Sequence, residues 1–448
     1  MGKIQLYPHQ QKELDETKEL NKVAFYHDWV MGLGKTFTGA EKMIQLGTYT
    51  NLVICQKSKI DDWMEHFKTY YSGYAVFDLT NPKEFINFGN MDAIKPPEFK
   101  IVGFINYELA FRRKPLLDFT GYTLMLDESS MIQNETAKRS KFILKLQPKN
   151  IILLSGTPTS GKYENLISQI HLLGWRISKD LFYRQYIDYH YEDNDGFPIM
   201  IIDGYKNVER LKSKLREYGC RFLKTEEVFD LPDQVFNLVS INTTKEYRKF
   251  KKDKIITVDV PVYDYSEHEE ENRTLKEIIQ KEFVGDTILT KMLYERMLCG
   301  SYNPEKLEAL KDLITSTEDR LIVFYNFNEE LRAIEDICFE LNRPLSIVNG
   351  QTKDLSFYEE YENSITAIQY QAGAMGLNLQ KANRIVYFTL PLSSELFEQS
   401  KKRTHRIGQQ RTCFYYMIIC KNSIEEKIRA TLEMRKDYTD ELFKEYDN

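Results

Sequence analysis

Met31-Gly-Leu-Gly-Lys-Thr36 is the stretch that decides the fold. It follows a short apolar run at 23–26 and precedes a segment at 37–46 with the composition of a helix. A strand, a glycine-rich turn and a helix in this order form a phosphate cradle, because glycines let backbone N–H groups face the anion. Lys35 can reach the β- and γ-phosphates of a nucleotide, and the Thr36 hydroxyl can hold Mg²⁺.

Short apolar runs alternate with helix-length segments outward from this turn. Most runs are continuous rather than alternating, which is typical of parallel strands that helices cover on both faces. The pattern predicts doubly wound α/β architecture, in which ligands bind at the carboxyl ends of the strands. The predicted strands are 23–26, 52–55, 101–105, 124–126 and 151–155 in the first half, and 321–325, 346–348, 367–369, 384–388 and 413–419 in the second.

The same alternation predicts two domains, 1–230 and 231–448, the second without a phosphate loop of its own. We expect a helical insertion at about 163–218 in the first domain, with an irregular patch at 189–198. We expect another at about 245–302 in the second, where the acidic run at 267–271 reads as a solvated start of a helical stretch.

Composition narrows the class of protein. The chain has 448 residues and a net charge of −6, which argues against a general polycation but allows a local basic groove. Its six cysteines form no Cys-x-x-Cys pair, which fits a reducing cytoplasm without a zinc module. No apolar run of 18 residues occurs, and the N-terminal stretch is too polar for a signal peptide. We therefore expect a soluble, cytoplasmic protein with no membrane partner.

An acid pair, Asp127 and Glu128, ends the predicted strand at 124–126. Asp127 is placed to bind Mg²⁺, and Glu128 to orient and deprotonate an attacking water. Adjacent acids after a strand can also simply begin a turn. The phosphate loop upstream and Leu153-Leu-Ser-Gly-Thr-Pro158 downstream favour the catalytic interpretation, because Ser155 and Thr157 suit a sensor of the γ-phosphate.

Further segments resemble the Swi/Snf-type ATPases, DNA translocases of helicase superfamily two. The most discriminating is Gln399-Ser-Lys-Lys-Arg-Thr-His-Arg-Ile-Gly-Gln409, which matches the family's arginine motif. Ala372–Leu379 resembles its glycine-rich motif, and Leu6–Gln10 its adenine-reading motif. Weaker resemblances, in the family's order, are at 53–67 with Trp63, 105–108, 127–134, 221–224 and 423–427.

The resemblance implies an α/β fold of two tandem RecA-like domains, with ATP and Mg²⁺ as ligands. It implies catalytic roles for Lys35, Asp127, Glu128, Arg403 and Arg406, the two arginines serving as fingers from the second domain. A basic helix face is the alternative for 401–411, and we interpret Lys401, Lys402 and Arg411 as surface charge. The implied nucleotide contacts are Gln10, Gly32, Leu33, Gly34, Lys35, Thr36, Gly376 and Asn378, and the implied metal contacts are Thr36 and Asp127. The residues implied to couple hydrolysis to movement are Ser130, Ser155, Thr157 and Gln399. The implied nucleic-acid contacts are Lys57, Ser58, Asn106, Tyr107, Gly350 and Gly373.

The chain departs from the family pattern at several positions. Trp29 and Val30 replace an acid pair before the phosphate loop, and Gln56 stands where proline is usual. Ser130 replaces the histidine that relays between ATP and the DNA-facing motifs. No catalytic group is lost, so we expect ATPase activity with altered coupling to movement.

These features predict an ATP-dependent translocase on double-stranded DNA that does not separate the strands and reads no sequence. Two alternatives remain open: a strand-unwinding helicase on DNA or RNA, and an ATP-gated clamp that does not travel. No segment resembles a histone-reading module, so we expect a minimal motor of the kind that the family has in bacteria and phages.

Overall fold

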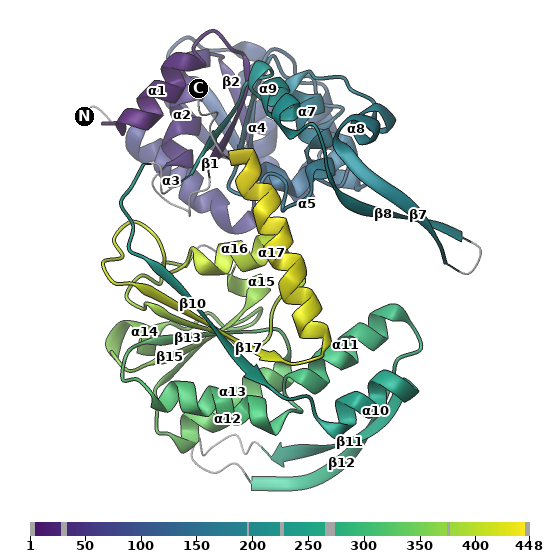
Figure 1. Cartoon of the computed structure of the whole chain (residues 1–448). Coiled ribbons are helices and arrows are strands. Elements are labelled where there is room, and N and C mark those ends of the chain that lie inside the picture. The colour runs from purple at the N-terminus through teal and green to yellow at the C-terminus, as the bar shows by residue number, and fades with distance from the viewer. Residues whose placement is uncertain are drawn as a thin grey trace. The chain divides into compact units, whose positions relative to one another are not determined.

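The computed structural model describes residues 5–27, 34–194, 197–224, 228–264, 274–373 and 377–443. The chain forms two compact units, and each is described by itself below. The first unit contains residues 1–230 together with 434–448, and the second contains residues 231–433. Figure 1 labels their helices and strands.

The first unit is built on a parallel sheet of seven strands. Alternate residues of one strand enter different cores: Val23 and Phe25 pack on one side of the sheet, and Ala24 and Tyr26 on the other. The strands are therefore buried on both faces, which is why they read as continuous apolar runs. In sheet order they are β3 (Tyr74–Asp78), β4 (Lys100–Asn106), β2 (Thr50–Cys55), β5 (Thr123–Asp127), β6 (Asn150–Ser155), β1 (Lys22–His27) and β9 (Cys220–Leu223).

Helices cover both faces of this sheet (Figure 1). The α-helices are α1 (Pro8–Glu16), α2 (Lys35–Leu46), α3 (Ile60–Tyr70), α4 (Pro82–Ile94), α5 (Tyr107–Ala110), α6 (Lys138–Ile143), α7 (Ile167–Leu173), α8 (Lys179–Tyr186) and α9 (Val208–Glu217). Short 3-10 turns are η1 (Lys57–Lys59), η2 (Lys114–Leu117), η3 (Ser129–Ile132) and η4 (Tyr163–Leu166).

The second unit repeats this plan with a parallel sheet of six strands. The predicted α/β class with two parallel sheets is thereby confirmed. The strands, in sheet order, are β10 (Gln234–Ile241), β17 (Cys413–Cys420), β16 (Arg384–Tyr387), β13 (Leu321–Tyr325), β15 (Ile365–Gln369) and β14 (Leu345–Val348). The helices that follow residue 231 are α10 (Lys245–Asp253), α11 (Ile288–Cys299), α12 (Pro304–Thr315), α13 (Asn328–Glu340), α14 (Ser356–Glu360), α15 (Tyr370–Gly373), α16 (Ser394–Lys401) and α17 (Ile424–Phe443).

Both predicted helical insertions contain an antiparallel hairpin as well as helices, so their purely helical description is wrong. In the first insertion, β7 (Ile187–Asn194) pairs with β8 (Phe197–Tyr205) across the patch interpreted as irregular. The sequence between these strands, Asp195-Gly196, is a dipeptide typical of two-residue hairpin turns, and it could have predicted the hairpin.

In the second insertion, β11 (Ile255–Asp264) pairs with β12 (Thr274–Val284), where the sequence suggested helix. The segment at 274–284 is rich in Lys, Glu and Gln, which favour helix locally, and pairing with β11 overrides that preference. The acidic run at 267–271 lies outside the described residues. Among the helices that the structure describes, none is long and apolar enough to span a bilayer.

Candidate functional site

The phosphate loop connects β1 to α2 at the carboxyl edge of the first sheet. Gly32 and Leu33 lie outside the described residues, which resume at Gly34. The Gly34 carbonyl accepts a hydrogen bond from the Thr38 backbone N–H at 3.0 Å and starts the helix. The Gln10 amide Nε2 donates to the same carbonyl at 3.1 Å, while its Oε1 accepts the Tyr7 N–H at 2.8 Å. Gln10 therefore ties the start of α1 to the end of the loop.

Lys35 lies in the first turn of α2, opposite the acid pair that ends β5. Its Nζ is 3.3 Å from Glu128 Oε1, and the two side chains are 9% and 18% exposed. Thr36, the next residue of the helix, is half-buried. Because β5, β6 and β1 are neighbours in the sheet, the cation, the acids and the hydroxyls of the loop after β6 share one edge.

The acid pair is held in place by two aromatic side chains. Trp63 of α3 donates its indole Nε1–H to Asp127 Oδ2 at 2.8 Å. The Tyr107 hydroxyl donates to the backbone carbonyls of Asp127 and Glu128 at 2.9 and 3.2 Å. Glu128 has a φ of 55°, a left-handed conformation that is costly for a residue with a Cβ. The two aromatic donors are well placed to maintain that conformation.

Burial dominates the electrostatics of Asp127. It raises the pKa of this carboxyl above its ordinary value, and the adjacent Glu128 carboxylate raises it further. The Lys35 ammonium and the Trp63 hydrogen bond act in the opposite direction. Because burial and Glu128 disfavour the charged form of the Asp127 carboxylate, a second cation bound beside it would stabilise that form.

The loop after β6 is connected to the acid pair through Gln169 of α7. Gln169 Oε1 accepts hydrogen bonds from Ser129 Oγ at 2.7 Å and Tyr26 OH at 3.0 Å, and its Nε2 donates to Pro158 O at 2.8 Å. Thus one buried amide touches the ends of β1, β5 and β6. The sequence analysis missed Gln169, and no local signal marks it, because its partners are distant in the chain.

The predicted coupling residues lie in both units, three in the first and one in the second. Ser155 ends β6, and its Oγ accepts the Thr157 N–H at 3.2 Å. Thr157 Oγ1 is buried and has no hydrogen-bond partner among the described residues, so it is a hydroxyl available to a ligand. Ser130 is buried within η3. Gln399 lies in the second unit on α16, where its Nε2 donates to Glu395 Oε1 at 3.2 Å.

In the second unit, the arginine motif begins in the last turn of α16 and continues beyond it. Arg406 Nη1 donates to Asn378 Oδ1, so the structure brings together two residues that the sequence predicted separately. Arg403 is 2% and Arg406 9% exposed, and burial lowers the pKa of Arg406. Gly376 lies outside the described residues. Lys401 is not surface charge as predicted: it is buried, 2.5 Å from Glu398 and over the Phe397 ring.

The predicted nucleic-acid contacts lie at the carboxyl edges of the two sheets. In the first unit, Lys57 and Ser58 are exposed after β2, and Asn106 ends the neighbouring β4. The Tyr107 ring is fully buried beneath the acid pair, so its side chain serves the scaffold. In the second unit, Gly373 ends α15, directly after β15.

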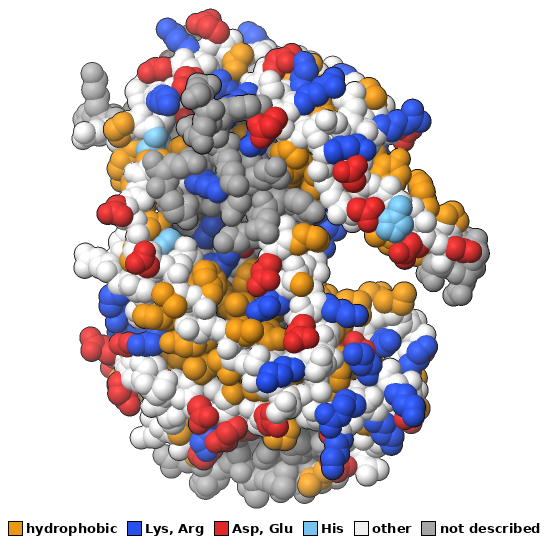
Figure 2. Space-filling model, in the orientation of Figure 1, with side chains coloured by type: hydrophobic (Ala, Val, Ile, Leu, Met, Phe, Trp, Pro, Cys, Tyr) orange, Lys and Arg blue, Asp and Glu red, His pale blue; other side chains and the backbone are white. Residues whose placement is uncertain are grey.

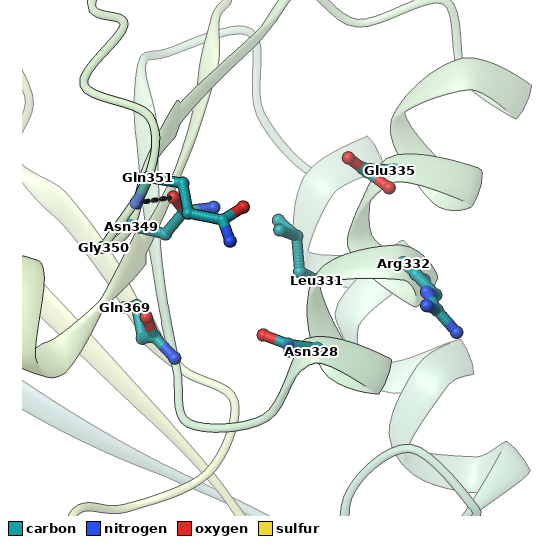
Figure 3. A pocket seen from close by; sticks show the side chains of 8 residues that line it. All are labelled: Asn328, Leu331, Arg332, Glu335, Asn349, Gly350, Gln351 and Gln369. Carbon is teal, nitrogen blue, oxygen red and sulfur yellow. Dashed lines mark hydrogen bonds between the residues drawn. The ribbon is translucent and has the colours of Figure 1, made fainter.

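Gly350 of the second unit opens onto a pocket of about 620 Å³ at the ends of β13, β14 and β15. Figure 3 shows its lining, in which amide side chains predominate and one arginine and one glutamate stand on α13. The pocket is lined by Asn328, Leu331, Arg332, Glu335, Asn349, Gly350, Gln351 and Gln369.

Among the described residues, one cluster has the chemistry of a metal site: Cys299, Cys420 and Glu425, all buried in the second unit. However, the Lys306 ammonium lies 2.5 Å from Glu425 Oε1 and already neutralises that carboxylate. Burial also raises the pKa of the Cys299 thiol, which disfavours the thiolate that a metal needs. We assign this cluster a structural role.

Comparison with known proteins identifies the family. The SNF2-related domain model matches residues 14–301, and the Helicase conserved C-terminal domain model matches residues 305–408. The chain is 25% identical over 440 residues to the mouse (Mus musculus) SWI/SNF-related matrix-associated actin-dependent regulator of chromatin subfamily A member 1, covering 91% of this chain and 40% of that protein.

A second relative is the ISWI chromatin-remodeling complex ATPase ISW1 of Saccharomyces cerevisiae, which is 25% identical over 463 residues, covering 97% of this chain and 40% of that protein. Among solved structures, the Sulfolobus solfataricus SWI2/SNF2 ATPase core in complex with dsDNA matches with a TM-score of 0.44 and 20% identity, over 98% of this chain and 93% of that one. The chain thus spans 40% of the length of these curated relatives. Because the first domain model alone covers more than half of its residues, the chain belongs to the SNF2-related domain family.

Proposed function

We propose that this chain is a Mg²⁺-ATP-dependent translocase on double-stranded DNA that moves without separating the strands. One observation carries the proposal: Lys35 of a phosphate loop faces Glu128 of an acid pair at the carboxyl edge of a parallel sheet. Membership of the SNF2-related domain family supports the choice of ATP as substrate and of DNA as the track.

The site residues have the following chemical roles in this proposal. Lys35 leaves Glu128 to bind the β- and γ-phosphates of ATP, which frees the Glu128 carboxylate to accept a proton from the attacking water. The Thr157 hydroxyl donates a hydrogen bond to the γ-phosphate. When hydrolysis removes that phosphate, the change is transmitted to Ser129 through Pro158 and Gln169. Arg403 and Arg406 of the second unit stabilise the charge on the transferring phosphoryl group.

Mg²⁺ fits the donor set, because the Thr36 hydroxyl and the Asp127 carboxylate are hard oxygen ligands. When bound, the ion would neutralise phosphate charge during hydrolysis. Trp63 holds one Asp127 oxygen at 2.8 Å and leaves the other for the ion.

DNA contact is proposed at Lys57, Ser58, Asn106, Gly350 and Gly373, with Tyr107 contributing through its backbone. These positions lie where parallel strands end, and they offer small residues and polar groups suited to phosphates. We therefore expect strong salt dependence and no sequence preference. All six cysteines are unpaired thiols, which supports a reducing cytoplasmic compartment for this activity.

The test is the ATPase rate with duplex DNA, single-stranded DNA and RNA, with Lys35→Ala as the inactive control. We expect stimulation by duplex that exceeds stimulation by single strands. A triplex-forming strand should be displaced, while a labelled strand of a tailed duplex should stay bound. Release of that strand would instead identify an unwinding helicase, and ATP-dependent affinity with little turnover would identify a clamp.

A further inference from the structure

Helix α10 of the second unit carries a dense group of cations. The ten residues from Lys245 to Lys254, KEYRKFKKDK, contain six basic and two acidic side chains, in a chain whose net charge is −6. All six cations are exposed, and Figure 2 shows basic side chains gathered over this region. We call Lys245, Arg248, Lys249, Lys251, Lys252 and Lys254 the α10 basic surface.

Carboxylates of the described residues do not pair with this surface. Within the described part of the chain, none of its six cations lies within 4.0 Å of an acidic side chain, although Glu246 and Asp253 belong to the same helix. Some exposed lysines elsewhere are paired: Lys179 lies 2.9 Å from Glu135, and Lys381 pairs with Glu359. Arg248 and Lys251 donate to the backbone carbonyls of Thr243 and Asn422, which leaves their positive charge, like that of the other four cations, to face an external polyanion.

Helix stability does not explain all of this charge. Cations in the last turn, such as Lys251 and Lys252, interact favourably with the helix dipole. Lys245 occupies the first helical position, where the dipole disfavours a cation, and Arg248 follows one turn later. Such a placement costs the helix stability, so it favours a role in binding.

The helix is a fixed platform. The Thr244 hydroxyl caps it by accepting the Tyr247 N–H at 3.1 Å. Tyr247 and Phe250 are buried, and the Tyr247 hydroxyl accepts the Ile424 N–H at 2.9 Å. Because the apolar face is docked on the unit, the cations at 245, 248/249 and 252 form rows spaced about 5 Å apart along the opposite face.

The α10 basic surface lies at the same sheet edge as the pocket at Gly350. Helix α10 follows the carboxyl end of β10, and Lys251 Nζ donates to the Asn422 carbonyl, just after the carboxyl end of β17. The pocket lies at the carboxyl ends of β13, β14 and β15 (Figure 3). Strands β10 and β14 are the two outer strands of a six-stranded parallel sheet, about 24 Å apart.

We propose that the α10 basic surface binds the sugar–phosphate backbone of duplex DNA as a contact additional to the pocket edge. This rests on the proposed function, which supplies the polyanion. A span of about 24 Å corresponds to about seven base pairs at 3.4 Å each, so one duplex lying along this edge reaches both places. Rows of flexible ammonium groups suit phosphates, and they read no sequence.

Two other partner classes fit the charge less well. An anionic membrane favours a basic helix whose apolar side chains face the lipid, but those of α10, Tyr247 and Phe250, are buried in the unit. An acidic peptide would not exploit the shared edge with the pocket. Both classes are included in the test below.

The test compares two triple variants of the full chain. One carries Lys245→Gln, Lys249→Gln and Lys252→Gln on α10. The matched control carries Lys95→Gln, Lys145→Gln and Lys149→Gln, exposed lysines near the amino ends of strands in the first unit, away from the carboxyl edge. Affinity for a duplex of about 30 base pairs, which exceeds the proposed span, is measured by fluorescence anisotropy between roughly 50 and 200 mM salt, the range over which phosphate contacts alter affinity strongly.

We expect the α10 variant to lose about 0.9 from the log–log salt slope per contact removed, so that the salt increase weakens its binding about 40-fold less than that of the wild type. The control variant and the DNA-independent ATPase rate should match the wild type. Equal slopes for the two variants would overturn the proposal. So would loss of binding to phosphatidylserine vesicles or to polyglutamate in the α10 variant, with its duplex slope unchanged.

The two proposals fail separately. A wild type that binds duplex but shows no duplex-stimulated ATPase would contradict the proposed function, while the salt slopes would still decide the role of α10. Circular dichroism of both triple variants verifies that they are folded.

Discussion

At the scale of single residues, the acid pair depends on neighbours that the sequence did not connect to it. Asp127 and Glu128 were predicted from their own pattern, but the indole that holds Asp127 comes from α3 and the phenol beneath them from α5. Such contacts between distant segments have no local signature. A buried Trp N–H needs a polar partner, but only the fold reveals which one.

The Trp63 hydrogen bond provides a direct test. Trp63→Phe keeps a ring against Phe67 and Phe104 but removes the donor to Asp127 Oδ2. A hydrogen bond to a charged group contributes about 1.5–3 kcal/mol, so we expect kcat for ATP hydrolysis to fall about 10- to 100-fold. Apparent Mg²⁺ affinity, measured by titrating the ATPase rate, should fall as well.

Trp175→Phe is the matched control, since Trp175 is buried in the same unit and stacks on Tyr218, away from the acid pair. Its ATPase rate should equal that of the wild type. If both tryptophan variants keep full activity, the indole does not position Asp127.

The raised pKa of Glu330 predicts how the stability of the second unit depends on pH. It is fully buried, and its Oε2 accepts hydrogen bonds from the N–H groups of Asn326 and Phe327 and from the Thr389 hydroxyl. Burial raises its pKa from the ordinary 4.5 to about 7 despite these donors. Between these values the folded state binds more protons than the unfolded state, so stability falls as pH rises from about 4.5 to 7.

Glu330→Gln, which stays neutral, should remove this decline. The difference in free energy of unfolding between variant and wild type should change by roughly 3 kcal/mol between about pH 4 and pH 8, a range that brackets both pKa values. Urea unfolding followed by circular dichroism measures it, since all three tryptophans (Trp29, Trp63 and Trp175) precede residue 231 and report on the first unit. Parallel pH profiles for the two proteins would contradict the assignment.

At the scale of elements, the phosphate loop depends on how closely α2 approaches the sheet. A Cβ on Gly39 would lie 2.7 Å from Leu154 Cδ1 and 2.9 Å from Met125 Sδ, on β6 and β5. Gly39→Ala would therefore push α2, with Lys35 and Thr36, away from the acid pair. We expect a loss of about 1–2 kcal/mol, the cost of overpacking reduced by the better helix propensity of alanine, and a higher KM for ATP.

Gly89→Ala in α4 is the control, because the nearest atom to its added Cβ is Phe119 Cζ at 4.0 Å. It should be neutral or stabilise the unit by about 0.5–1 kcal/mol. Tryptophan fluorescence during urea unfolding measures both variants. Equal stabilities would show that the space at Gly39 does not limit the packing of α2.

The predictability of each element follows from its burial. Strands covered on both faces, such as β6 and β13, were predicted to within a residue, because continuous apolar runs are unambiguous. The edge strands β3 and β10 were missed: β3 is short and half-buried, and β10 is mostly exposed and mixes polar with apolar residues. The hairpin of β11 and β12 was missed because its pairing overrides a local preference for helix, whereas the Asp195-Gly196 signal of the β7–β8 hairpin was overlooked.

At the scale of the whole molecule, the site predictions were most specific where a motif provides all its groups locally. Lys35, Asp127 and Glu128 lie along one sheet edge because β1, β5 and β6 are neighbours. Arg406 and Asn378 come together in the second unit from two separate motifs. How the arginines serve a nucleotide held by the first unit stays a prediction.

Arg406 tests whether hydrolysis requires both units. Arg406→Lys keeps a positive charge but loses the planar fork that fits a transferring phosphoryl group. We expect kcat to fall about 10³-fold, the lower end of the effect of arginine fingers, while ATP affinity stays within about threefold, since the first unit holds the phosphates.

Arg411→Lys is the matched control, because Arg411 is exposed and pairs with Asp319 at 3.3 Å. Fluorescent-nucleotide binding and single-turnover hydrolysis separate the two quantities. Loss of affinity together with turnover would make Arg406 a binding residue, and equal turnover in both variants would remove the finger from the mechanism and leave the first unit to hydrolyse ATP alone.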